Sequence, residues 1–281
     1  MLVICPTPIG NLDDITARQR QVLKTADIIA CEDTRRAGKL LERLAIERSQ
    51  GRPRLWRYDD HTARGQVEPI VEALKEGKSV VLISDAGTPT ISDPGYRLVR
   101  ACRQAGQEVT ALPGPVAAVV ALSGSGLASD RFYFEGFLPG NRAERQGRLM
   151  ALEGLRTTVV AYESPRRVVE ALRDVVEVCG EEREVCVARE LTKVHEEYLV
   201  GGVKKVYEEL AKRESVRGEI VLCIAAAQAE EDDEEEWKEA DRAIEVLHGQ
   251  GLSARTIKDI VSELYDVPRS QIYDRIDTVI R

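Results

Sequence analysis

Short apolar runs alternate with longer amphipathic stretches along most of the chain, and no other feature constrains the fold as strongly. Apolar runs that predict strands cover 2–5, 27–31, 55–58, 79–83 and 108–112. Helical patterns between them cover 15–25, 35–45, 66–76 and 95–105. Strands that alternate with helices of this length build a mostly parallel sheet with helices on both faces. The sequence therefore predicts an N-terminal α/β domain over 1–118.

A second α/β block is predicted over 119–229, which suits a chain of 281 residues. It follows a small-residue helix at 117–129, which we interpret as the crossing between the domains. Its expected strands cover 132–136, 157–162, 184–188, 196–201 and 219–225. A helix is expected over 165–178, with Pro165 in its first turn.

The last part of the chain differs from the rest. Residues 230–236 read EEDDEEE, and we expect a solvated acidic hinge over 230–237. Three helical stretches follow, over 239–248, 254–264 and 269–280, with Ser253 and 268–270 as start signals. The apolar spacing between 252 and 276 predicts a small helical module of the helix-turn-helix type over 238–281.

The formal net charge is −8, but the charge is distributed unevenly. The acidic run at 230–236 alone supplies seven negative charges, whereas the segment 34–58 carries eight basic residues against Glu42 and Glu47. A local positive excess of this kind favours a polyanion such as RNA, because phosphate binding relies on lysine and arginine. The alternative is a solvated helix followed by a loop that binds nothing.

Other classes of protein are disfavoured. No apolar run approaches the roughly 18 residues that a membrane-spanning helix needs, and the N-terminus lacks the basic region of a signal peptide. We therefore expect a cytoplasmic protein with no membrane partner. The six cysteines are far apart and form no CxxC pair, which predicts reduced thiols and no metal site.

Three loops that combine glycine with proline follow predicted strands of the first domain. They cover 7–11, 84–89 and 113–115. Ligands of open parallel sheets bind beyond the carboxyl ends of the strands, so these loops are the candidate site. None fits GxGxxG or GxxxxGK[ST], which argues against a dinucleotide enzyme and a P-loop NTPase.

The same loops belong to a longer series of motifs. These are TPIGNLDDIT (7–16), EDTRRAGKLL (32–41), ISDAGTPTISDPGYRLV (83–99), LPGPVAAVVALSGSGL (112–127), FYFEGFLP (132–139), YESPRRV (162–168), ARELTKVHEE (188–197) and GEIVL (218–222). Together they resemble the tetrapyrrole methylase superfamily and, more narrowly, its ribosomal branch, the 16S rRNA (cytidine-2′-O)-methyltransferases. The resemblance covers about 1–225, and 253–276 is similar to the C-terminal domain of that branch. Two segments depart from the pattern: 58–62, which leaves a role for His61 open, and 140–148, a weaker basic arm.

The resemblance implies two α/β domains of the class III methyltransferase type with a cleft for the methyl donor, S-adenosylmethionine, between them. It further implies 2′-O-methylation of a cytidine ribose in the decoding region of the small ribosomal subunit, and a homodimer. By resemblance and by their place in the three loops, the donor-binding candidates are Pro8, Gly10, Asp85, Gly87, Thr88, Gly114, Val116, Ala117, Tyr162, Glu163, Ala188, Arg189, Glu219 and Ile220. The alternative for Asp85 is an Asx turn or a helix cap.

Methyl transfer to a ribose hydroxyl also calls for a general base, because the hydroxyl is a weak acid. Asp33 and Glu190 are the candidates, since both follow predicted strands and have basic neighbours. The alternative is that these charges only order their loops. The candidates for RNA phosphates are Arg35, Arg36, Arg166, Arg167 and Lys193. Arg166 and Arg167 have an alternative as a solvated helix N-terminus.

The donor carries a positive sulfonium whose charge disappears in the transition state. An anion against the sulfur would therefore slow the reaction, and carboxylates are expected only at the ends of the donor. Two other functions compete with RNA methylation. One is a small-molecule methyltransferase acting on a precorrin, and the other is a sensor that binds the donor without turnover.

Overall fold

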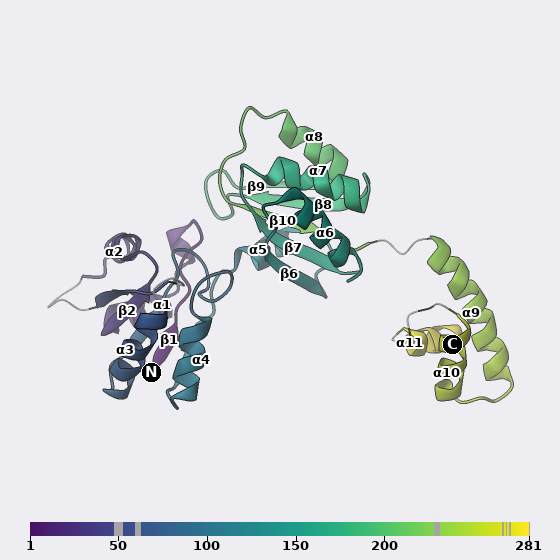
Figure 1. Ribbon diagram of the computed structural model, residues 1–281, viewed down its shortest axis with the longest axis horizontal. Coiled ribbons are helices and arrows are strands. Elements are labelled where there is room, and N and C mark those ends of the chain that lie inside the picture. The colour runs from purple at the N-terminus through teal and green to yellow at the C-terminus, as the bar shows by residue number, and fades with distance from the viewer. Residues whose placement is uncertain are drawn as a thin grey trace. The chain divides into compact units, whose positions relative to one another are not determined.

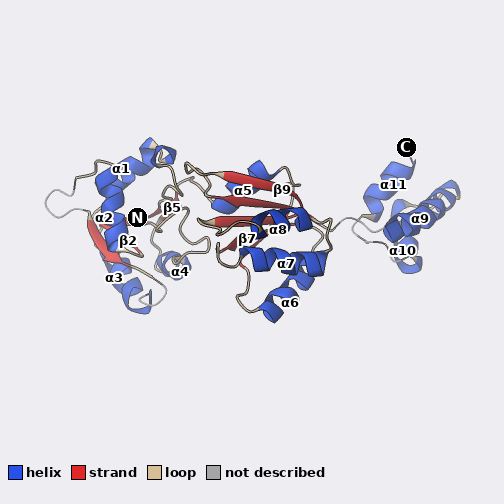
Figure 2. Cartoon of the chain, turned by 90° about the horizontal axis from the view of Figure 1, so that it is seen from above, coloured by secondary structure: helices blue, strands red, loops and turns tan. Residues whose placement is uncertain are grey.

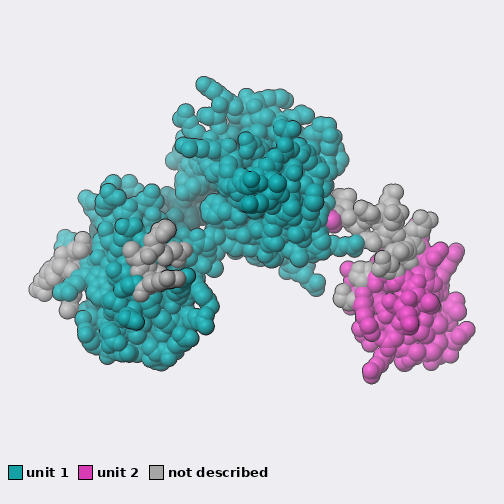
Figure 3. All heavy atoms as spheres, in the orientation of Figure 1, with its two compact units in different colours: residues 1–226 teal, residues 227–281 magenta. Residues whose placement is uncertain are grey.

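The computed structural model describes residues 1–47, 53–59, 63–227, 231–265, 267, 269 and 271–280. The chain divides into two compact units, 1–226 and 227–281 (Figures 1 and 3). The first unit holds two five-stranded sheets, one built from residues before 112 and one from residues after 131. A domain boundary at 118/119 stays a prediction, since the two sheets belong to one compact unit.

The first sheet is parallel, with the strand order β3-β2-β4-β1-β5. Its strands are β1 (Leu2–Ile4), β2 (Ile28–Cys31), β3 (Arg54–Arg57), β4 (Val80–Leu82) and β5 (Val109–Ala111). The connecting helices are α1 (Ala17–Thr25), α2 (Thr34–Arg43), α3 (Ala63–Lys75) and α4 (Tyr96–Gln104), and the short 3₁₀ helix η1 (Leu12–Asp14) precedes α1.

Both faces of this sheet are buried. Leu2 and Ile4 pack in one core with Ile70 of α3, whereas Val3 packs in a second core with Leu41 of α2. Successive side chains of a strand point to opposite faces, so near-continuous apolar strands need helices on both sides. The predicted doubly covered parallel sheet is confirmed.

The second sheet is mixed, with the order β6-β7-β10-β8-β9. Its strands are β6 (Phe132–Phe137), β7 (Thr158–Glu163), β8 (Glu184–Arg189), β9 (Glu197–Gly202) and β10 (Ile220–Ile224). The last strand in the chain, β10, lies between β7 and β8 and runs antiparallel to both. The predicted α/β block is confirmed, with strands in mostly antiparallel pairs.

Helices cover both faces of the second sheet as well. The helix α5 (Ala117–Ser125) packs on one face, and α6 (Arg142–Glu153), α7 (Val168–Cys179) and α8 (Val203–Ala211) pack on the other (Figure 2). The prediction for Pro165 was wrong, because α7 begins only at Val168 and Pro165 lies in the turn before it. The helix α6 occupies the segment that the sequence suggested as a basic arm.

The second unit contains α9 (Glu231–Gly249), α10 (Ala254–Leu264) and α11 (Ile272–Ile280). Their core includes Ala240, Ile257 and Ile276, which are almost fully buried. The solvated hinge at 230–237 stays a prediction, and the acidic run forms the start of α9 from Glu231 onward. Glutamate is a good helix former, and carboxylates are favoured at a helix N-terminus. Ser253 caps α10 as predicted, whereas residues 268 and 270 lie outside the described residues.

All six cysteines are free thiols, in agreement with the sequence prediction. Within the described ranges, no helix has the length and apolar character needed to cross a membrane.

Candidate functional site

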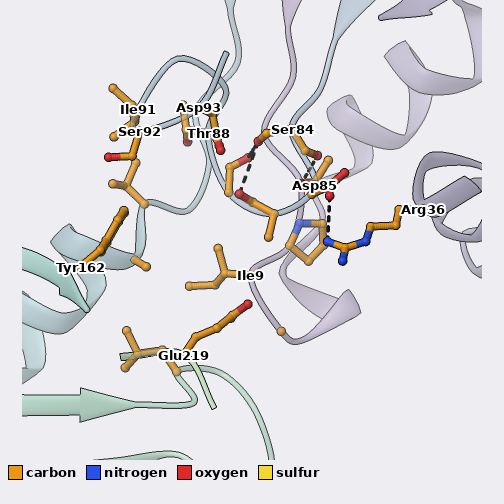
Figure 4. A pocket seen from close by; sticks show the side chains of 18 of the residues that line it. Ile9, Arg36, Ser84, Asp85, Thr88, Ile91, Ser92, Asp93, Tyr162 and Glu219 are labelled. Atoms are coloured by element: carbon orange, nitrogen blue, oxygen red, sulfur yellow. Dashed lines mark hydrogen bonds and ion pairs between the residues drawn. The ribbon is translucent and has the colours of Figure 1, made fainter. Parts of the chain in front are cut away.

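A pocket of about 740 Å³ lies at the carboxyl ends of β1, β2 and β4 and is completed by residues of the second sheet (Figure 4). This is the edge of a parallel sheet at which ligands bind. The first sheet contributes the loops after β1 and β4, together with one side of α2. The second contributes the ends of β6, β7 and β10 and the loop after β8.

The loops after β1 and β4 hold each other in place. The backbones of Thr7 and Gly87 exchange hydrogen bonds of 2.9 and 3.0 Å, and the Thr7 hydroxyl donates to the Ser84 carbonyl at 3.2 Å. Gly87 has a φ of +87°, a backbone conformation that residues with a Cβ atom seldom adopt. The Thr88 hydroxyl donates to the Pro115 carbonyl at 2.8 Å, which ties the third loop to the other two. The predicted meeting of the three loops is confirmed.

An ion pair stands at one end of the pocket. Arg36 Nη1 lies 2.8 Å from Asp85 Oδ2, and the two side chains are 70% and 27% exposed (Figure 4). The pair joins α2 to the loop after β4. The guanidinium is therefore held at the pocket wall while most of its surface stays open to solvent.

A second carboxyl lines the pocket at Asp93, which sequence reasoning missed. Burial raises its pKa to about 6, Asp85 adds to the rise, and a hydrogen bond with Ser84 opposes it. No lysine or arginine within the described part of the chain is among the groups that shift this pKa. At neutral pH the site therefore holds a half-buried negative charge, and none of the described groups that shift its pKa is a cation.

Aromatic rings line the pocket on the side of the second sheet. Tyr162 packs edge-to-face against Phe134 and Phe137, with ring centroids 5.1 and 5.6 Å away. Burial raises the pKa of the Tyr162 hydroxyl, and the nearby carboxylate of Asp93 contributes to the rise. In Figure 4, Tyr162 and Arg36 lie at opposite ends of the pocket.

Most of the predicted donor-binding residues line this pocket. They are Pro8, Gly10, Asp85, Gly87, Thr88, Val116, Ala117, Tyr162, Glu163, Glu219 and Ile220. Gly114, Ala188 and Arg189 do not. A Cβ at Gly114 would lie 2.2 Å from Pro6 Cβ, so this glycine permits two loops to pack closely. Ala188 is fully buried in the core, and Arg189 forms an ion pair with Glu197 at 2.9 Å.

The two candidate bases do not line the pocket. Asp33 caps α2 by accepting hydrogen bonds from the backbone N–H groups of Arg35 (2.8 Å) and Arg36 (3.4 Å), and these bonds lower its pKa. Glu190 accepts from Lys193 Nζ at 2.7 Å and from the Glu219 N–H at 3.0 Å, which also lowers its pKa. Both carboxylates therefore order loops beside the pocket.

The predicted phosphate-binding residues are dispersed. Arg36 and Lys193 line the pocket, whereas Arg35 is 89% exposed beside it. Arg166 is exposed, and Arg167 pairs with the buried Glu163 at 2.7 Å. His61 lies outside the described residues.

Two further cations of α2, Lys39 and Arg43, line the pocket together with Arg36. Both belong to the basic segment 34–58, but the sequence analysis did not name them as phosphate-binding candidates. Positions three and seven residues apart share one helix face, so the spacing of 36, 39 and 43 was the available signal. One wall of the pocket is therefore cationic.

Comparisons with known proteins identify the family of the chain. The model of the family Tetrapyrrole (Corrin/Porphyrin) Methylases matches residues 1–207. The chain is 42% identical over 273 residues to "Ribosomal RNA small subunit methyltransferase I" of Escherichia coli O157:H7, covering 97% of this chain and 93% of that protein. A protein of the same name from Bacillus subtilis (strain 168) is 38% identical over 278 residues, covering 98% and 93%.

Solved structures share the fold at low identity. A cobalt precorrin-4 methyltransferase has a TM-score of 0.57 and 18% identity, covering 79% of this chain and 93% of that one. A uroporphyrin-III C-methyltransferase from Thermus thermophilus, complexed with S-adenosyl homocysteine, has a TM-score of 0.54 and 17% identity, covering 80% and 96%. With the family model matching more than half of its length, the chain belongs to the tetrapyrrole methylases.

Proposed function

We propose that this chain transfers the methyl group of S-adenosylmethionine to the 2′-hydroxyl of a cytidine ribose in the 16S rRNA of the small ribosomal subunit. Relatives at 38–42% identity over nearly the whole chain carry a ribosomal RNA methyltransferase name. The observation that carries the proposal is the wall of the pocket formed by Arg36, Lys39 and Arg43. A pocket for a donor needs no such wall, whereas an acceptor with a phosphate backbone does.

The residues present fit the donor. It carries an ammonium at its methionine end, and the Asp93 carboxylate is a half-buried anion without a cationic neighbour among the described groups that shift it. We assign Asp93 to that ammonium, in line with the expectation that carboxylates serve the ends of the donor. Gly87 lines the pocket without a side chain, and Ile9 and Val116 form apolar walls.

The main contribution of the protein to the reaction is to position the reactants. An in-line displacement needs the acceptor oxygen and the methyl carbon near attack distance on one axis, and effective molarities from such positioning are large. The cross-linked loops that contain Thr7, Gly87 and Thr88 provide a rigid floor for this purpose. Asp33 stays our candidate for the base, because Cys31 before it and Arg36 after it both line the pocket.

The variant Asp33→Asn separates the proposed role of Asp33 as general base from its role as the cap of α2. Asp33→Asn should lower single-turnover methylation by about 100-fold or more if the carboxylate takes the ribose proton. The helix cap survives, because asparagine caps helices as well as aspartate does. Donor affinity should stay unchanged, as measured by calorimetry. An unaltered single-turnover rate would exclude Asp33 as the base and leave it as the cap of α2.

The cationic wall predicts the salt dependence of RNA binding. The plot of log K against log salt concentration has a negative slope. Replacing Lys39 and Arg43 together by glutamine should make this slope less steep by about 1.4 to 2, because two phosphate contacts are lost. Titrations of RNA binding at several salt concentrations measure this slope. The matched control replaces Arg18 and Lys24, exposed cations of α1 outside the pocket, and should leave it unchanged. Equal slopes in all three proteins would remove α2 from the RNA-binding surface.

The double replacement of Arg35 and Arg36 tests the N-terminal end of α2 in the same way.

A methyl-transfer assay tests the proposed function directly. The protein is incubated with labelled donor and, separately, with small ribosomal subunits from cells that lack the enzyme, with naked rRNA, and with a precorrin. Label on the 2′-oxygen of a cytidine in the ribosomal subunits supports the proposal. Label on the precorrin alone identifies a small-molecule methyltransferase. Donor binding without transfer to any acceptor identifies a sensor.

From the resemblance we further propose that the protein works as a homodimer in the cytoplasm. Sedimentation equilibrium tests the first point, and a monomer at micromolar concentration would contradict it. Fractionation of cells tests the second.

A further inference from the structure

Phe137 is an exposed aromatic residue at the pocket. It lines the pocket, and yet it is 58% exposed. Its ring contacts Tyr162 edge-to-face, with an interplanar angle of 66°. Tyr162 is in turn packed on Phe134 in the same edge-to-face manner. The supported ring thus offers a free aromatic face at the edge of the pocket.

A β-bulge in β6 orients the Phe137 ring toward the pocket. The register of β6 against β7 shifts between Phe134 and Gly136, so that Phe137 pairs with Tyr162. Without the extra residue Gly136 would occupy that place, and the ring would point to the opposite face of the sheet. Gly136 has a φ of +77°, and a Cβ there would lie 3.4 Å from Ser92 Oγ. The bulge therefore re-aims one aromatic side chain toward the pocket.

The opposite end of the pocket carries the cations. Arg36 lies at one end of the view in Figure 4 and Tyr162, which supports Phe137, at the other. A nucleotide has the matching polarity, with a phosphate on one side of its ribose and a flat base on the other. A ribose hydroxyl that reacts inside a pocket must bring its base along, and such a base leaves its stack.

We propose that Phe137, supported by Tyr162, stacks on the base of the nucleotide that is methylated, so that this nucleotide is bound extruded from the RNA. The inference rests on the proposed function and adds the conformation of the acceptor. Stacking tolerates any base, because every base has a π face. Phe137 therefore contributes affinity for the extruded nucleotide, and the choice of cytosine rests on other groups.

The test replaces the ring by an apolar side chain of similar size. Phe137→Leu should lower kcat/KM on small ribosomal subunits by about 5- to 140-fold, the range expected for loss of one base–aromatic stack. Phe137→Trp should restore it, since a larger ring stacks at least as well. Donor affinity measured by calorimetry should stay within about twofold in both variants. Tyr96→Leu is the matched control, an exposed aromatic of α4 outside the pocket, and should behave as the wild type.

The outcomes are distinct. An unchanged kcat/KM in Phe137→Leu would overturn the inference while leaving the proposed function intact. A drop in donor affinity equal to the drop in kcat/KM would overturn it too, by moving Phe137 to the donor. A fall that tryptophan does not restore would reduce Phe137 to a packing role, and melting temperatures of the variants would show it. A wild-type protein that binds donor but methylates no ribosomal subunit would contradict the proposed function itself, and the inference with it.

Discussion

Replacing Asp93 by asparagine is expected to weaken donor binding by about 30-fold or more and at the same time to stabilise the protein at neutral pH. Loss of one partner of a desolvated charge pair costs about 2 kcal/mol or more, and asparagine cannot supply the charge that the donor ammonium needs. Calorimetric titration with the donor measures the first effect. Thermal unfolding without donor measures the second.

The direction of the stability effect follows from the pKa of Asp93. Burial raises this pKa from 3.8 to about 6, so the folded protein binds the proton more tightly than the unfolded chain does. The contribution of Asp93 to stability is complete below pH 3.8 and is lost as the pH rises through 6. Asp93→Asn removes that loss, so its gain in melting temperature should be larger at pH 8 than at pH 5.

Donor binding should show the opposite dependence on pH in the wild type. Affinity is expected to fall as the pH drops below about 6, because the protonated carboxyl no longer attracts an ammonium. Asp93→Asn should lack this step between pH 5 and 8. Asp130→Asn, which changes an exposed carboxylate outside the pocket, is the control and should retain it. Full donor affinity in Asp93→Asn would refute the assignment of Asp93 to the donor.

The expected loss of donor affinity and gain of stability in Asp93→Asn indicate that the Asp93 carboxylate serves ligand binding and lowers the stability of the free protein. An ionised, half-buried carboxylate without a cationic neighbour among the groups that shift its pKa disfavours the folded state until a ligand supplies the counter-charge. Functional sites often hold such groups, whereas a carboxylate retained for stability alone acquires a partner. Glu197 is the contrast within this chain, since Arg189 and Arg213 lower its pKa to about 2.

The first sheet was predictable because its strands follow a local rule. Its strands are short, and three of them, β1, β4 and β5, are apolar runs followed by a glycine–proline loop. The rule for parallel sheets places those three loops together. Asp93 was not predictable in this way. Thr90 and Ser92 before it have φ values of 77° and 57°, a conformation that non-glycine residues seldom adopt. The turn that brings Asp93 into the pocket is therefore imposed by tertiary packing.

Two other departures have equally specific causes. Gly114 was predicted as a donor contact because glycine admits a ligand, but the neighbour it admits is Pro6 of an adjoining loop. Phe137 was missed as a site residue because the predicted strand ends at 136. Strict alternation along β6 would also assign Phe137 to the other face, and the bulge at Gly136 reverses that assignment. Sequence patterns predict which segments approach a site, whereas bulges and strained turns decide which side chains enter it.

The segment 140–148 illustrates the same limit for charge. Its arginines were interpreted as a weak basic arm, but in the structure they form ion pairs within the protein. Arg148 lies 2.7 Å from Glu135, and Arg142 and Arg145 both pair with Asp174. Arg145 and Asp174 are each only 1% exposed. A count of basic residues therefore overestimated the positive surface available to RNA.

Asp174→Leu is expected to lower the free energy of unfolding by about 3–5 kcal/mol, the usual cost of leaving one charge of a buried pair uncompensated. Arg145 donates to Asp174 Oδ2 from Nε at 2.7 Å, and its other acceptors are the carbonyls of Pro139 and Gly140 at 3.2 and 3.3 Å. Those carbonyls satisfy hydrogen bonds but carry no negative charge to replace that of Asp174. Urea unfolding measures the loss.

Two further variants decide whether charge or packing is responsible. Arg142→Gln should cost less than about 1 kcal/mol, because the Arg142 side chain is 54% exposed and solvent screens its pair with Asp174. The double variant Arg145→Met/Asp174→Leu removes both buried charges, so it should recover most of the stability that Asp174→Leu loses. The single variant Arg145→Met is measured for comparison. If the loss of stability in the double variant equals the sum of the losses in Arg145→Met and Asp174→Leu, packing rather than the uncompensated charge sets the cost.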